Sequence, residues 1–159
     1  MPVYRHLLVV VDLTEDSLVI GRRAQALATL SGAEMELLHV VEFVPVEPMG
    51  ETLMPSVHIE DELLDRARQR LASLAGELGV PLTATRVEAG NVKSEIVRIA
   101  REHGADLIVL GSRERHGLSI LVNLTEDTVL HAAPCDVLAV RVGPRGLSEQ
   151  SSPSLAQRR

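Results

Sequence analysis

The chain has 159 residues, of which 45% are hydrophobic, and its formal net charge is −6. A domain of this length buries roughly two thirds of its unfolded surface, so we expect one folded unit. The negative charge disfavours binding to a phosphate backbone, and a chain with no Trp, one Phe and one Tyr has few platforms on which bases could stack. We therefore expect no nucleic-acid partner.

The single cysteine, Cys135, excludes an internal disulfide and fits a reducing compartment. The first six residues lack the charged and then apolar layout of a signal peptide. No apolar run approaches the ~20 residues that a membrane-spanning helix needs. These features predict a cytoplasmic protein with no membrane partner.

Short aliphatic runs alternate along the chain with segments of helical periodicity. Strands are predicted at residues 6–11, 34–41, 107–110 and 136–142, with a half-polar edge strand at 83–88. Helices are predicted at residues 15–31, 59–78, 92–103 and 125–132. Such alternation predicts an α/β fold: a single open five-stranded parallel sheet, doubly wound, with helices on both faces.

Local signals mark where these elements begin and end. Thr14 and Asn91 are predicted N-caps of the helices that follow them. Gly111 and Ser112 are predicted to open a turn whose backbone N–H groups point outward. Residues 42–57 hold three prolines and read as a long loop, and residues 143–159 read as a disordered tail behind a domain of residues 1–142.

The turn after the first strand excludes two kinds of nucleotide-binding motif. It reads Asp12-Leu13-Thr14-Glu15-Asp16-Ser17, with no glycine, which excludes a dinucleotide fingerprint and a Walker loop. A phospho-receiver domain needs an Asp closing the third strand and a Lys closing the last, and residues 87–89 and 141–142 supply neither.

Several segments, in this order and at this spacing, carry a family resemblance. They are residues 6–12, 37–40, 105–113, 117–119 and 131–140, of which Ala105-Asp106-Leu107-Ile108-Val109-Leu110-Gly111-Ser112-Arg113 is the most specific. Over about residues 4–142 the chain resembles a universal stress protein of the UspA family. The resemblance implies an adenine nucleotide alpha hydrolase-like fold and a dimer joined through the last strand.

Members of that family that bind ATP resemble one another in a Gly-x2-Gly-x9-Gly-Ser/Thr signature, whose glycines let the backbone approach the phosphates. Gly111 matches the first glycine, and Glu114 stands at the second. The third falls on Leu124 when residues are counted forward, or on Asn123 when they are counted back from Pro134. Because the Glu114 carboxylate would face triphosphate charge, the resemblance favours no cofactor, with ATP as the alternative.

The resemblance implies a set of nucleotide contacts, and for some of these residues a purely structural role is an alternative interpretation. The candidate contacts are Asp12, Val40, Gly111, Ser112, Asn123 and Thr125. Asp12 is read equally well as a cap of the following turn, Val40 as core, and His39 as a structural histidine. The histidines show no metal-like spacing, and no catalytic triad or carboxylate pair emerges, so we expect no enzyme.

The last strand is the predicted dimer surface, because it is hydrophobic and no later element covers its edge. Its residues are Val137, Leu138, Ala139, Val140 and Val142. The sequence thus favours a dimeric regulatory or interaction module with a degenerate nucleotide site and an unknown protein partner. The alternative is a nucleotide-dependent switch that binds ATP or AMP and hydrolyses ATP slowly.

Overall fold

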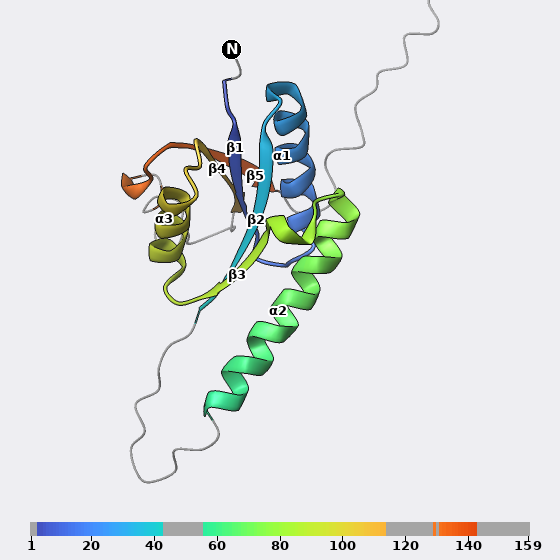
Figure 1. Ribbon diagram of the computed structural model, residues 1–159, viewed down its shortest axis with the longest axis vertical. Helices are drawn as coiled ribbons and strands as arrows, with labels where there is room; N and C mark the ends of the chain where they lie inside the picture. Colours follow the sequence, from blue (N-terminus) through green and yellow to red (C-terminus); the bar gives the residue numbers. More distant parts are fainter. Residues whose placement is uncertain (1–2, 43–55, 114–128, 130, 143–159) are drawn as a thin grey trace, which may run out of the picture.

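The computed structural model of the protein describes residues 3–42, 56–113, 129 and 131–142. Its strands are β1 (His6–Val10), β2 (Glu34–Val41), β3 (Thr85–Ala89), β4 (Leu107–Arg113) and β5 (Asp136–Val142). Its helices are α1 (Ser17–Ser31), α2 (Ser56–Leu78) and α3 (Val92–Glu102), with a 3-10 turn at Leu82–Ala84. The five strands form one sheet in the order β3-β2-β1-β4-β5, and every pairing is parallel (Figure 1). The predicted doubly wound sheet is confirmed.

Helices cover both faces of this sheet. α1 and α2 pack on one face and α3 on the other (Figure 1). Successive residues of β1 point to opposite faces, so Leu7 and Val9 join the α1/α2-side core while Leu8 joins the α3-side core. This two-sided burial explains why the strand reads as a continuous aliphatic run rather than as an alternation.

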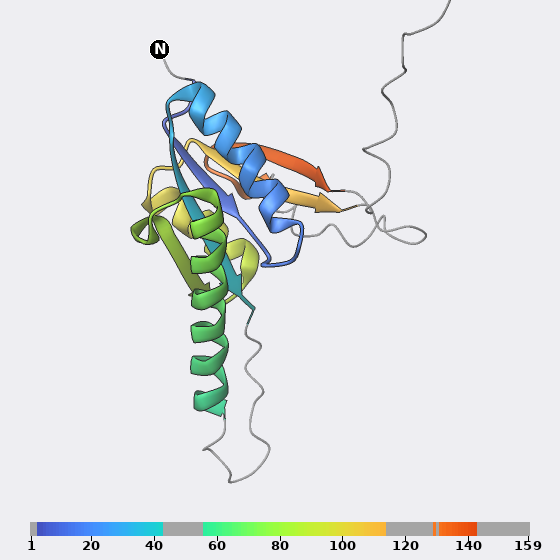
Figure 2. The same cartoon turned by 90° about the vertical axis from the view of Figure 1, so that its right-hand side faces the viewer.

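The strand order reverses at β1, which lies between β2 and β4. In open α/β sheets, ligands bind outside the carboxyl ends of the strands at such a switch point. α2 follows β2 in the chain and runs back against the strand direction, so its amino-terminal part extends past this edge of the sheet (Figure 2). The fold therefore places the carboxyl ends of β1 and β4 where a ligand site is expected.

One of the two predicted helix caps is confirmed and the other is wrong. Asn91 caps α3 as predicted, because its Oδ1 accepts the backbone N–H of Ser94 at 3.1 Å. Thr14 does not cap α1: the helix begins at Ser17, and its N-cap is Asp16, whose side chain makes no capping bond. The Thr14 hydroxyl instead donates to Asp12 Oδ1 at 2.6 Å, and the helix begins two residues later than predicted.

Other boundaries moved for local reasons. β3 begins at Thr85 rather than at residue 83, because the chain after Pro81 first makes the 3-10 turn, closed by Ala84 N–H donating to the Pro81 carbonyl. α2 begins at Ser56, so the predicted loop ends earlier than residue 57. Residues 43–55 of that loop, the predicted tail and most of the predicted helix 125–132 lie outside the described residues; Val129, His131 and Ala132 are helical.

Candidate functional site

The turn after β1 is organised by Asp12. Its Oδ1 accepts three hydrogen bonds: from the Thr14 backbone N–H at 3.0 Å, from the Thr14 hydroxyl at 2.6 Å and from the Ser17 hydroxyl at 3.1 Å. Ser17 is buried at the start of α1. The carboxylate therefore joins the end of β1 to the beginning of α1, which is the capping role that the sequence offered for Asp12 beside nucleotide contact.

Leu13, the next residue, has a left-handed backbone with φ of 59°. This conformation is unfavourable for a residue with a Cβ and persists only where neighbours hold it. The guanidinium of Arg70 on α2 donates to the Leu13 carbonyl oxygen. Next to this contact lies an open cavity of about 330 Å³, to which Leu13, Ser17, Arg70 and Ser73 contribute. α2 thus supports the shape of the turn from outside the sheet.

Val40 and His39 lie toward the carboxyl end of β2. Val40 is 8% exposed and belongs to the α3-side core with Ile96. His39 Nδ1 lies 2.8 Å from the Val11 carbonyl oxygen and donates to it, because a carbonyl only accepts. His39 is therefore a bonded structural histidine, as the sequence favoured, and Val40 fills the core whether or not it also meets a ligand.

Gly111 is not in a turn, contrary to the prediction. β4 continues through it to Arg113, and Gly111 pairs with Val140 of β5 while Ser112 pairs with Arg141. A Cβ added at Gly111 would lie 2.5 Å from Ile20 Cδ1 of α1. The glycine is therefore required for the close approach of α1 to β4. The prediction failed because a Gly-Ser pair indicates a turn only when no neighbouring residue fills the space that a side chain on the glycine would need.

Four of the six predicted site residues thus lie in or directly after three adjacent strands, near the carboxyl ends of those strands. Asp12 follows β1, Val40 lies in β2, and Gly111 and Ser112 lie in β4. Asn123 and Thr125 lie outside the described residues. Within the ranges that the structure does describe, no group of three His, Cys, Asp or Glu side chains is arranged to hold a metal ion.

Cys135 has a packing role. It is half-buried and contacts the α3-side core. Burial raises the pKa of its thiol, and the Asp136 and Asp106 carboxylates raise it further, so the group is neutral at physiological pH.

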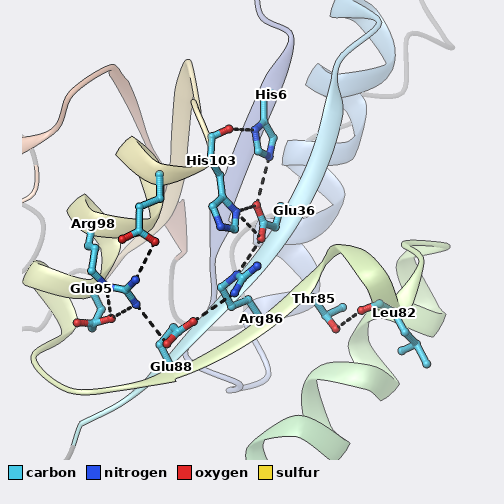
Figure 3. Close-up of polar contacts among 10 residues, drawn as sticks. His6, Glu36, Leu82, Thr85, Arg86, Glu88, Glu95, Arg98 and His103 are labelled. Carbon is cyan, nitrogen blue, oxygen red and sulfur yellow. Dashed lines mark hydrogen bonds and ion pairs between the residues drawn. The ribbon is translucent and has the colours of Figure 1, made fainter.

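A second polar cluster, missed in the sequence, lies near the amino ends of β1 and β2. Glu36 of β2 is buried there at 7% exposure and contacts His6, His103 and Arg86 (Figure 3). One signal could have found it: Glu36 stands two and four residues before Leu38 and Val40, which point into the α3-side core.

Comparison with known proteins decides the family. The sequence matches the universal stress protein family over residues 3–141. The chain belongs to this family. Universal stress protein A homolog 1 of Coxiella burnetii is 35% identical over 138 residues, which are 86% of this chain and 96% of that protein. The resemblance found in the sequence is confirmed.

Solved structures of universal stress proteins share the fold. UspA from Lactobacillus plantarum superimposes with a TM-score of 0.63 at 26% identity, covering 87% of this chain and 98% of that chain. A universal stress protein solved in complex with cAMP superimposes with a TM-score of 0.57 at 24% identity, covering 86% and 97%. In the described part of this universal stress protein, no helix is long and apolar enough to cross a membrane.

Proposed function

We propose that this universal stress protein is a cytoplasmic, homodimeric regulatory module that acts by binding a protein partner, with no catalytic role and with a degenerate nucleotide site. The observation that carries the proposal is the packing of Gly111. It is the one glycine of the family's ATP signature that this chain keeps, and Ile20 occupies the space that a side chain would need. Its presence is therefore explained without a phosphate.

The remaining features of the site agree with this reading. Asp12 Oδ1 already accepts three internal hydrogen bonds, so a ligand hydroxyl must compete with them for that oxygen. Glu114 stands where the family signature has its second glycine. A carboxylate ~5 Å from a phosphate charge costs roughly 3 kcal/mol at an effective dielectric of about 20. The expected affinity for a nucleoside triphosphate is therefore low.

Calorimetric titration tests the nucleotide part of the proposal. The parent protein, titrated with Mg-ATP and with cAMP, is expected to bind neither with a Kd below about 1 mM. The triple variant Glu114→Gly, Asn123→Gly, Leu124→Ser is expected to gain affinity for Mg-ATP, because it restores the glycines and removes the carboxylate. Asp12→Ala in that variant checks the place of binding. Micromolar binding by the parent contradicts the degenerate site.

The proposal of a dimer rests on the exposure of β5. This strand ends the sheet order and pairs only with β4 among the described strands. Its side chains include Leu138, which is 38% exposed. An unpaired hydrophobic edge is a template for another strand, and a two-fold axis lets β5 of a second copy fill it in antiparallel orientation.

Sedimentation measures the dimer directly. At micromolar concentration the parent is expected to sediment as a dimer, and Leu138→Glu is expected to shift it to monomer by placing charge in the apolar contact. Leu82→Glu is the matched control, because Leu82 is 65% exposed and lies before β3 at the other edge of the sheet. A monomeric parent, or equal effects of the two substitutions, contradicts this surface.

The second candidate function is a nucleotide-dependent switch with slow ATP hydrolysis. Asp12, Val40 and Ser112 lie near the carboxyl edge at the switch point, where this fold binds ligands, and a universal stress protein of the same fold was solved with cAMP. The same titration separates the two functions, since a switch requires the parent to bind nucleotide.

A further inference from the structure

The amino-terminal part of α2 lies largely exposed beyond the sheet. No residue from Ile59 to Arg66 is buried, and burial begins at Ala67, which is 6% exposed. We call residues 59–66 the α2 arm; it extends past the carboxyl edge of the strands (Figure 2). In proteins most helical stability comes from covering an apolar face rather than from propensity. A contact with another molecule would therefore stabilise the arm.

The arm carries a short apolar line flanked by acidic side chains. Ile59 and Leu63 are one helical turn apart, and they are 55% and 41% exposed. At about 100° per residue, Glu60 and Glu62 lie on opposite sides of this line, each about 80° from its middle. Neither glutamate has an ion pair among the residues that the structure describes. The arm therefore presents an apolar line between two carboxylates.

The outer face of α1 has the same pattern with the opposite charge. Val19, Ala26 and Leu30 are exposed, and they fall within about 40° of one line along the helix. Arg22 and Arg23 are also exposed and lie on opposite sides of this line. Neither guanidinium has an ion pair within the described ranges, and α1 contains no acidic residue. This α1 face therefore presents an apolar line between two cations.

An open groove lies beside the α1 face, between α1 and the carboxyl-terminal half of α2. Its volume is about 680 Å³, and its lining includes Arg22, Ala26 and Leu30 of α1 and Glu77 of α2. Helices pack by fitting the side-chain ridges of one into the grooves of another. The groove therefore leaves room for the side chains of an incoming helix.

We propose that the α2 arm of one copy docks on the α1 face of a second copy. The two apolar lines then meet, and the glutamates of the arm lie against the arginines of α1. Complementary charge determines which surfaces pair, and each of these surfaces carries the charge that the other lacks. Two copies related by a two-fold axis can exchange their arms reciprocally. The contact uses neither β5 nor the candidate nucleotide site, so it does not rest on the proposed function.

The contact is small, so we expect weak association. Two helical faces of two or three turns bury less area than the roughly 1,200–2,000 Å² of a stable interface. We therefore expect a Kd on the order of 100 µM. The β5 dimer is expected at micromolar concentration, so Leu138→Glu removes that contact and leaves the arm contact to be measured alone.

Charge reversal in the Leu138→Glu protein tests the docking. Sedimentation at about 300 µM, roughly three times the expected Kd, should show an associated fraction. Arg22→Glu with Arg23→Glu should raise the Kd at least about tenfold, and so should Glu60→Lys with Glu62→Lys. All four changes in one chain should restore the association, because the facing charges are again opposite in sign.

Overall charge is controlled within this set of variants. The four changes together leave the net charge of the Leu138→Glu protein unaltered. Glu60→Lys with Glu62→Lys makes the protein less negative, so overall repulsion alone predicts more association where docking predicts less. Lys93→Glu with Arg101→Glu is the matched control on α3 and should leave the Kd unchanged at about 0.15 M salt, where distant charges are screened.

Several results would overturn the proposal. They are a monomer at about 300 µM, association that neither reversal weakens, an equal loss in the α3 control, and a folded four-change variant that stays monomeric. A monomer would mean that the arm serves a different partner. If the four-change variant does not fold, Leu30→Gln decides: Leu30 is 86% exposed, and its loss should weaken association about threefold or more. Leu82→Gln, at an exposed leucine outside α1, should not weaken it, and equal effects of the two substitutions contradict the docking.

Discussion

Leu71→Ala is expected to lower the free energy of unfolding by about 2–5 kcal/mol, because a buried leucine loses both its transfer free energy and its packing contacts. Leu71 is 1% exposed and lies in the α1/α2-side core. Leu63→Ala is the matched control in the same helix, since Leu63 is 41% exposed. Its cost should stay below about 1 kcal/mol.

Urea unfolding of both variants measures the difference. α2 is anchored to the sheet through Leu71, Leu74 and Leu78, whereas the part toward Ile59 extends past the strands (Figure 2). Equal losses in the two variants would mean that the extended part of α2 packs as tightly as the anchored part, in contradiction to the exposure of Leu63.

Gly111→Ala is expected to cost about 1–3 kcal/mol, the usual cost of overpacking a core. The added Cβ meets Ile20 Cδ1, and Ile20 is itself only 4% exposed. Ile20→Val removes that Cδ1, so the double variant Gly111→Ala, Ile20→Val should recover most of the loss. The recovery appears as a coupling energy in a double-mutant cycle.

The control for this cycle is another glycine. Gly76 lies in α2 with no atom within 4 Å of an added Cβ, so Gly76→Ala should be neutral or stabilising. Chemical denaturation of the four proteins of the cycle and of the Gly76 variant gives the comparison. Additive effects of Gly111→Ala and Ile20→Val would show that Gly111 is needed for a reason other than the approach of α1.

The fold could be predicted because burial leaves a direct trace in the order of residues. The two-sided burial of β1 and β4 produces aliphatic runs, and the helical spacing of Ile96, Ile99 and Ala100 gives the face of α3 that packs on the sheet. The Asn91 cap is a local interaction within three residues, so its signal was also complete.

The site was less predictable because its signals depend on distant neighbours. Thr14 has the residue type of an N-cap, but its hydroxyl donates to Asp12 and α1 begins only at Ser17. Gly111 has the residue type of a turn, but it lies in β4 against Ile20 of α1. The Glu36 cluster joins positions separated by 67 residues between Glu36 and His103. Such contacts arise from the pairing of β1 with β2 and β4. Their only signal in the sequence is a polar residue at a position that faces the core.

The tie between Arg5, His6 and Asp106 bears on the order of folding. Asp106 Oδ1 accepts the His6 backbone N–H across 100 residues of chain, and Asp106 N–H donates in return to the His6 carbonyl. Closing so long a loop costs entropy that only the assembled sheet repays. We therefore expect these contacts to complete late in assembly, after β1 and β4 have met. Interactions that form after the transition state slow unfolding without speeding folding, so we expect these contacts to lengthen the lifetime of the folded chain rather than to speed its formation.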